Sequence, residues 1–260
     1  MRTYLAKEGR NHKDINKLKL LTCKTSPKAR EIIVSYRDPA SRITSSFVNK
    51  FHIYENRTIF DSKKKIQTFA KEFADKITPS LRRNHGARRK HGDFSLRDMI
   101  IFLWERKRSG CLSEVNPHFT PQLLSQKELD AVMSCRHRGI RLFPLKVESF
   151  RDDLNAINKA LEINYTPPRT NSTSLPDQGW TFSDSADLID SPLSKLYADK
   201  VIPKSASLRK ALQQDQDFNA KYMEVFEHDD ALCQWMDSVR QTGQNRRILF
   251  VRPSMQDANA

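Results

Sequence analysis

Two arginines and a serine follow one short apolar run at spacings suited to binding a phosphate group. Arg37 comes directly after the run IIVSY, and Arg42 and Ser45 lie on the helix expected next. A guanidinium presents a planar fork of N–H donors, and a serine hydroxyl adds one short neutral donor. These residue types therefore predict anion recognition. The alternative is a capped helix whose arginines are simply solvated.

The elements that would position these side chains are predicted by the residues around them. Ile32–Tyr36 is β-branched and aromatic, which is typical of a buried strand. Asp38 suits the N-cap of the following helix, and Pro39 suits its first position, where no amide donor is needed. Ligands of open α/β sheets bind beyond the carboxyl ends of strands, and helix N-termini attract anions. Arg37 is expected at such a strand end.

Further hydrophobic patterns predict helices interleaved with a second strand. The expected helices are Lys63–Ile77, Phe94–Arg108, Ser149–Leu161, Ser207–Gln213 and Phe218–Val239, and the expected strand is Leu142–Val147. Ser95 and Asp98 fit a capping signature at the start of the second helix, and Gly110 is expected to stop it. Strands that alternate with helices indicate an α/β fold with a helix-rich C-terminal part.

The chain of 260 residues is long enough for one large domain. We expect a polar N-terminal segment at 1–30, an α/β core at 31–165, a loop at 166–192, a C-terminal helical part of the same domain at 193–251 and a tail at 252–260.

The charge of the chain is unevenly distributed around a formal net charge of +14. Residues 57–108 carry 15 Lys and Arg against 6 Asp and Glu, whereas residues 171–237 carry 6 against 12. The densest basic stretch, LRRNHGARRKHG at 81–92, is expected to be an exposed loop. It is either simply solvated or a contact for an anionic glycan or a nucleic acid. No aromatic residues interleave with its arginines, which disfavours single-stranded nucleic acid.

The cysteine spacing and the hydropathy of the chain argue against a disulfide scaffold, a zinc site and a membrane span. The four cysteines form no CxxC motif and no zinc-like spacing with histidine, so we expect small buried thiols in a reducing compartment. No apolar run approaches 18 residues, and the start MRTYLAKEGR lacks the apolar core of a signal peptide. We therefore expect no membrane span and a cytoplasmic location.

The segment RDPASRITSSFVNKF at 37–51 resembles the 3′-phosphate-binding motif of carbohydrate sulfotransferases, the family that includes the HNK-1 and chondroitin sulfotransferases. The motif of that family is R-D-P-x-x-R-(aliphatic)-x-S-x-(aromatic)-x-x-K-(aromatic), and every specified position is matched here. Other segments resemble the family in the same order, spanning about residues 30 to 236. They are FSLRDMIIFL at 94–103, NPHFTPQ at 116–122, LKVESFRDDLNAINKALEIN at 145–164, PPRTNSTS at 167–174 and, loosely, 221–236.

The resemblance implies a P-loop-like parallel sheet and transfer of a sulfuryl group from 3′-phosphoadenosine-5′-phosphosulfate (PAPS) to a carbohydrate hydroxyl, with no metal. It implies that Arg37 and Ser45 bind the 3′-phosphate, with Arg42 in the same pocket. His118 is the candidate general base, and the alternative is a structural histidine bonded to a loop carbonyl. Glu148 is either another base or an ion-pair partner. The basic 57–108 region would suit a carbohydrate acceptor, acidic glycans included.

One part of the family pattern is not matched. The family has a 5′-phosphosulfate loop, resembling P-K-x-(Gly/Ala)-(Ser/Cys/Gly)-(Thr/Ser), well before the RDP strand. KTSPK at 24–28 has no glycine and lies too close to Ile32 for a whole βα unit, and only Cys135 stands where the family has a cysteine pair. We therefore expect the first βα unit to be missing. The chain would then be a truncated or degraded sulfotransferase, or a non-catalytic remnant that binds a nucleotide or an anionic glycan. A missing upstream segment would allow a membrane-associated or Golgi location instead.

Overall fold

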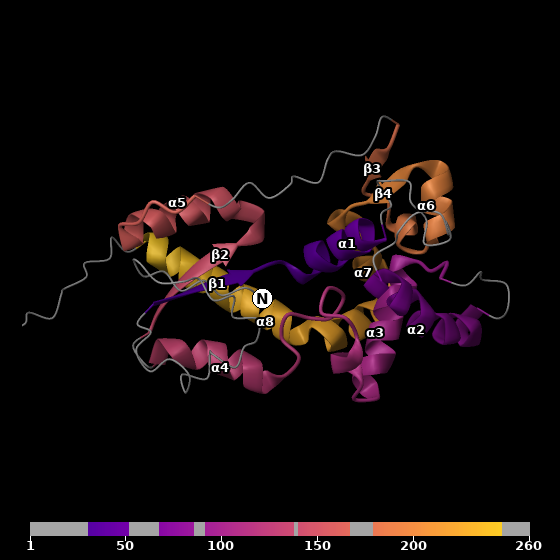
Figure 1. The fold of residues 1–260 in the computed structure, drawn as a ribbon, viewed down its shortest axis with the longest axis horizontal. Helices are drawn as coiled ribbons and strands as arrows, with labels where there is room; N and C mark the ends of the chain where they lie inside the picture. Colours follow the sequence, from indigo (N-terminus) through magenta and orange to yellow (C-terminus); the bar gives the residue numbers. More distant parts are fainter. Residues whose placement is uncertain (1–30, 52–67, 86–91, 138–139, 167–178, 246–260) are drawn as a thin grey trace, which may run out of the picture.

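The structure is a computed structural model that describes residues 31–51, 68–85, 92–137, 140–166 and 179–245 (Figure 1). In chain order its elements are β1 (Glu31–Tyr36), α1 (Pro39–Lys50), α2 (Thr68–His85), α3 (Leu96–Arg108), η4 (Leu112–Glu114), α4 (Gln126–His137), β2 (Arg141–Lys146), η5 (Val147–Ser149), α5 (Phe150–Leu161), β3 (Thr181–Ser183), η6 (Ala186–Ile189), α6 (Leu193–Asp199), β4 (Val201–Pro203), α7 (Ser205–Gln214) and α8 (Gln216–Asn245). The fold is mixed α/β and rich in helix, as predicted at that coarse level.

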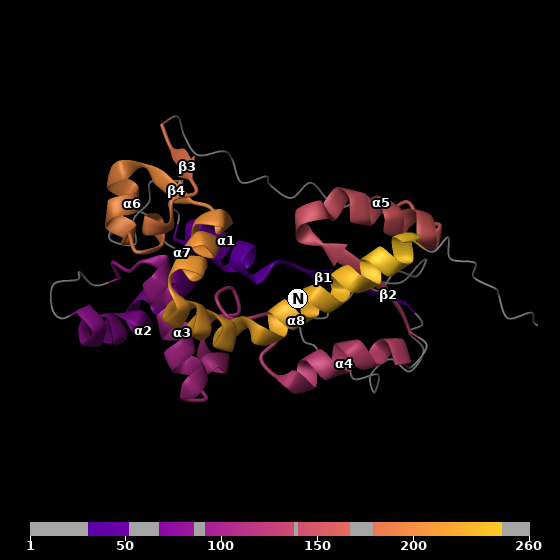
Figure 2. The same ribbon diagram turned by 180° about the vertical axis from the view of Figure 1, so that it is seen from behind.

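β1 and β2 form a parallel pair that is covered by helices on both faces. The register runs from Glu31 opposite Arg141 to Tyr36 opposite Lys146. The even-numbered residues of β1 pack against α4 and α8, whereas Ile33 packs against α5. Figures 1 and 2 show α4 and α5 on opposite sides of the strands. Burial on both faces explains why the IIVSY run does not alternate between apolar and polar residues.

A second and larger core lies among α1, α2, α3, α6, α7 and the first half of α8. Its centre is aromatic: Phe51 stacks on Phe119 with ring centroids 5.3 Å apart and meets Phe94 edge-on at 4.9 Å. Helix α8 belongs to both cores, because Phe226 lies in this one and Leu232 packs under the sheet. Figure 2 shows α8 running from one core to the other.

The strand, cap and helix predicted around Arg37 are confirmed. β1 ends at Tyr36, and the Asp38 side chain caps α1 by accepting the Ser41 amide at 2.7 Å. Pro39 occupies the first helical position. The apolar stripe that ends at Phe51 is buried, so the polar face of α1 is turned away from the core.

The predicted limits of α3 are also confirmed. Ser95 and Asp98 form the reciprocal capping box, with each side chain bonded to the backbone of the other. Gly110 has a φ of 72° and lies two residues beyond the helix end. That left-handed conformation is easily adopted by glycine, which explains the stop.

The prediction of a loop at 81–92 was wrong for residues 81–85, which are helical, although Arg82 and Arg83 are exposed as predicted. α2 continues through Pro79 to His85, and Leu81 is buried. Phe73, Ile77 and Leu81 follow each other at intervals of four, so burial of one apolar stripe outweighs the helix-breaking tendency of Pro79. Residues 86–91, like the predicted helix start before 68, lie outside the described part.

The loop predicted at 166–192 was wrong in part as well. It contains β3 and η6. The Thr181 amide donates to the Lys200 carbonyl at 2.9 Å where β3 pairs in parallel with β4. The partner strand lies about twenty residues downstream, so no local pattern signals this pairing.

Several expectations fall on segments that the structure does not describe. They concern residues 1–30 with KTSPK, the loop residues 167–178 and the tail at 252–260. Within the described residues, no helix combines the length and the apolar character needed to cross a membrane.

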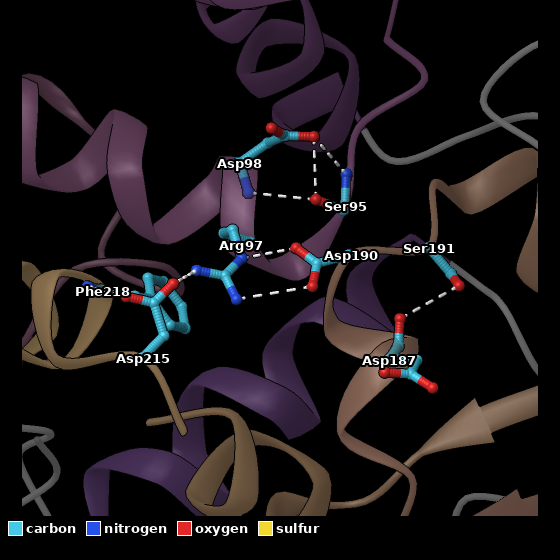
Figure 3. Close-up of polar contacts among 8 residues, drawn as sticks. All are labelled: Ser95, Arg97, Asp98, Asp187, Asp190, Ser191, Asp215 and Phe218. Atoms are coloured by element: carbon cyan, nitrogen blue, oxygen red, sulfur yellow. Dashed lines mark hydrogen bonds and ion pairs between the residues drawn. The ribbon is translucent and has the colours of Figure 1, made fainter. Parts of the chain in front are cut away.

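Arg97 joins three segments that are distant in sequence (Figure 3). From α3 it donates to Asp190, which follows η6, and to Asp215 at 2.6 Å, just before α8. Its guanidinium also lies 4.1 Å from the ring centroid of Phe218. Burial would lower the pKa of Arg97, but the two carboxylates raise it above the ordinary value.

We predict that Arg97→Ala lowers the free energy of unfolding by about 1 to 2 kcal/mol, since two part-exposed ion pairs and a cation–π contact are lost. Arg97→Lys should lose less, because it keeps the charge but not the planar fork. Urea denaturation followed by circular dichroism measures the difference. Arg136→Ala, at an exposed arginine of α4, is the control. An Arg97→Ala midpoint equal to that of the control would contradict the prediction.

Candidate anion-binding site

Asp38 fixes the turn between β1 and α1. Besides the Ser41 amide, its Oδ1 accepts from the guanidinium of Arg209 on α7 at 2.7 Å. Burial opposes ionisation of this carboxyl, but the Ser41 amide and Arg209 together hold its pKa below the ordinary value. The turn is therefore tied to both the following helix and a distant one.

Arg37 lies at the carboxyl end of β1, as the sequence predicts. Its backbone is held on both sides: the amide donates to Gln122 Oε1 at 3.3 Å, and the carbonyl accepts from the Cys233 thiol at 3.2 Å. The Nε atom lies 3.5 Å from Glu148 Oε1, just beyond the end of β2. Nε itself is buried and has no hydrogen-bond partner in the described structure. The backbone is thus fixed while the guanidinium keeps donor capacity.

Ser45 lies two helical turns along α1 from the cap. Its hydroxyl oxygen accepts from the Asn49 side chain at 2.9 Å. Both residues are partly buried on the polar face of the helix. The Asn49 contact fixes the position of the hydroxyl and leaves its hydrogen as a donor.

Arg42, on the same face of α1, is turned toward the segment 116–123. One Nη donates to the carbonyl of Thr120 and the other to that of Pro117, the latter at 2.9 Å. Burial lowers the pKa of Arg42, Asp229 opposes that effect at 3.9 Å, and the charge of Arg37 adds to it. Arg42 therefore joins α1 to the segment that carries His118.

Asp229 of α8 holds the other end of this segment. Its two carboxylate oxygens accept from the amides of Gln122 and Leu123, each at 2.8 Å, and only 1% of the residue is exposed. Burial raises the pKa of Asp229, whereas Arg42 and the two amides oppose the shift. We call Arg42, Asp229 and the segment 116–123 the loop clamp.

His118 lies on the clamped segment with its side chain exposed. Its amide donates to Asn116 Oδ1 at 3.0 Å, which shapes the turn locally. Partial burial, followed by the nearby charges of Lys50 and Arg42, lowers the pKa of His118. The neutral imidazole, which is the form that can accept a proton, is therefore favoured more than in an unperturbed histidine.

Four of the predicted residues thus form two groups, and Ser45 is bonded to Asn49 on its own helix. Arg37 pairs with Glu148 at the sheet edge, so Glu148 has the ion-pair role that was one of its two predicted alternatives. Arg42 and His118 are brought together through the 116–123 segment. Among the described residues, no group of three or more His, Cys, Asp and Glu is arranged to hold a metal ion.

Asp229, Gln122 and Cys233 were not predicted to take part. One signal for Asp229 was available in the sequence, because it falls in a helical apolar series that includes Phe226 and Leu232. A carboxylate in the buried stripe of a helix requires partners. The sequence does not reveal that those partners are amides more than a hundred residues away.

No family model, no curated protein and no solved structure matches this chain. The interpretation of the site therefore rests on its own geometry.

We predict that Asp229→Asn lowers the free energy of unfolding by about 3 kcal/mol, since it leaves Arg42 without its buried counter-charge and replaces one accepting oxygen by an amide NH₂ group that can only donate. Chemical denaturation measures the loss. Asp199→Asn, at an exposed position ending α6, is the matched control. If both variants unfolded at the same denaturant concentration, the loop clamp would not be a major source of stability.

The stability of the protein is expected to depend on pH through the carboxyl group of Asp230. Burial, and then the charges of Asp38 and Asp229, raise its pKa to about 6. The folded state therefore holds this proton more tightly than the unfolded chain, with its pKa of about 3.9. Stability from this group is present at low pH and is lost as the pH rises from about 4 through 6.

Asp230→Asn should therefore be about 1 to 3 kcal/mol more stable than the wild type at pH 7.5 and nearly equal to it at pH 4. Unfolding curves at the two pH values provide the measurement, with exposed Asp152→Asn as the control. A gain in stability of the same size at both pH values would show that the folded state does not raise the pKa of Asp230.

Proposed function

We propose that this chain is a PAPS-dependent carbohydrate sulfotransferase that binds the 3′-phosphate of its cofactor at the turn between β1 and α1. The observation that supports it is the strand, cap and helix arrangement carrying Arg37 and Ser45 at the positions of the sulfotransferase motif. We further propose that β1 and β2 belong to a P-loop-like sheet, since they are parallel and Arg37 lies at their carboxyl edge.

The donors that we propose for a phosphate monoester are Arg37 at this turn and Ser45 two helical turns along α1. Arg37 has a buried Nε without a hydrogen bond, and its side chain is still 31% exposed. Ser45 has a hydroxyl that Asn49 holds in place. One charged fork and one neutral donor would hold the phosphate in a defined orientation. Arg42 was predicted in the same pocket; with both Nη atoms on carbonyl oxygens, we propose that it positions the 116–123 segment beside it.

PAPS would supply the activated sulfuryl group, and catalysis would consist mainly of positioning and charge stabilisation, as in phosphoryl transfer. In this proposal His118 accepts the proton of the acceptor hydroxyl. Its lowered pKa favours the neutral form needed for that task, and the loop clamp holds its backbone. General-base assistance of this kind contributes about 10²- to 10⁴-fold in rate.

The acceptor we propose is a carbohydrate, with acidic glycans included. Supporting this, α2 exposes Lys71, Arg82 and Arg83 to solvent within the basic 57–108 region. For the location we propose a reducing compartment such as the cytoplasm, since Cys111 and Cys233 are free thiols.

The first test is binding of the product nucleotide, 3′-phosphoadenosine-5′-phosphate (PAP), measured by calorimetry. Arg37→Ala should weaken binding about 10- to 100-fold, because a charge-assisted bond is lost, and Ser45→Ala about fivefold. Arg136→Ala, at an exposed arginine of α4, should bind as the wild type does. Equal affinity of the Arg37 and Arg136 variants would contradict the proposed phosphate site.

The second test separates an enzyme from a binding protein. Transfer of labelled sulfate from PAPS to a panel of glycans should occur with the wild type and fall by at least about 10²-fold in His118→Ala. PAP binding without transfer would support the alternative of a non-catalytic nucleotide-binding remnant. Binding of nucleic acid that weakens steeply with salt but survives Arg37→Ala would support neither.

A further inference from the structure

Glu148 is the one acidic side chain that faces the guanidinium of Arg37 in the described structure. It lies on η5, in the first turn after β2, and Arg37 lies in the first turn after β1. Because the strands are parallel with Tyr36 opposite Lys146, both residues leave the sheet at the same edge. The pair is therefore a direct consequence of the sheet register.

Glu148 approaches the Arg37 guanidinium at its Nε atom. Nε is buried and lies 3.5 Å from Glu148 Oε1, yet it forms no hydrogen bond. The side chain as a whole is 31% exposed, so the exposed surface belongs to its other atoms. Glu148 thus partly neutralises Arg37 without closing a strong bond to it.

The neighbouring carboxylates already have partners of their own. Asp38 is bonded to the Ser41 amide and Arg209, and Asp229 belongs to the loop clamp. The Glu148 side chain is 34% exposed and, within the part of the chain that the structure describes, forms its ion pair with Arg37 alone. Within the described residues it is the carboxylate that forms an ion pair with Arg37.

We propose that Glu148 is a specificity-determining residue that acts as a built-in counter-ion of Arg37. It competes with incoming anions for the guanidinium, so the site selects ligands that form paired, charge-assisted bonds to Arg37. This inference deepens the proposed function and rests on it only for the identity of the nucleotide.

The free energies of the two interactions allow a phosphate to bind in spite of Glu148. An exposed ion pair without good hydrogen-bond geometry contributes between zero and about 1 kcal/mol. A phosphate that forms paired, charge-assisted bonds to a guanidinium gains more than that. The carboxylate therefore lowers the affinity of every anion, and a ligand with paired bonds to the guanidinium still binds.

The test compares Glu148→Gln and Glu148→Ala with the wild type by calorimetry, using PAP and inorganic phosphate as separate probes. Both variants should bind each probe about two- to tenfold more tightly, because both remove the negative charge that competes for Arg37. The gain should shrink in high salt. The matched control is Asp152→Asn, which removes one exposed charge from α5 without facing Arg37.

The outcomes are distinct. Tighter phosphate binding by both Glu148 variants without any PAP binding would support the counter-ion and reject the nucleotide. Unchanged or weaker affinity in both variants would overturn the counter-ion, while wild-type PAP binding would still support the proposed function. An equal gain in Asp152→Asn would reduce the effect to general charge and overturn the inference. Weaker binding in Glu148→Ala alone would mean that Glu148 orients Arg37, which also overturns it.

Discussion

The arrangement of this site depends on one buried interaction, between the carboxylate of Asp229 and the backbone of the 116–123 segment. A carboxylate that is 1% exposed is costly unless it is fully bonded, and here two amides and Arg42 satisfy it. The same contact positions α8 against α1. Asp229, Cys233 and Asp237 follow at intervals of four residues, so they form one stripe along α8. The Cys233 thiol bonds the carbonyl of Arg37, and Asp237 accepts from Tyr36 at 2.6 Å.

This stripe explains how a sheet of two strands keeps a defined edge. Asp237 also accepts from the Lys146 ammonium at 2.7 Å, so one carboxylate spans the last residues of β1 and β2. Desolvation and the Asp237 carboxylate raise the pKa of Tyr36 well above its ordinary range, so its hydroxyl stays a donor. The residues just beyond, Arg37 and Glu148, are consequently held at adjacent positions. Their side chains are 31% and 34% exposed.

The sequence was most informative where the physics is local. The β-branched strand, the Asp38 cap and Pro39 at the first helical position each follow from neighbouring residues, and each was found. The long-range features could not be predicted in the same way. The pairing of β3 with β4 and the bonds of Asp229 to distant amides depend on tertiary packing. Pro79 inside α2 is a case in which burial of Leu81 overrode a strong local signal.

The central claim is that Arg37 and Ser45 together hold the 3′-phosphate of PAPS or PAP. The most direct test is a crystal structure of the full chain grown with PAP. The account predicts a phosphate within hydrogen-bond distance of the Arg37 guanidinium and the Ser45 hydroxyl, with Arg42 still bonded to the carbonyls of Pro117 and Thr120. A nucleotide bound elsewhere, or a phosphate held by Arg42 with Arg37 still facing Glu148, would contradict it.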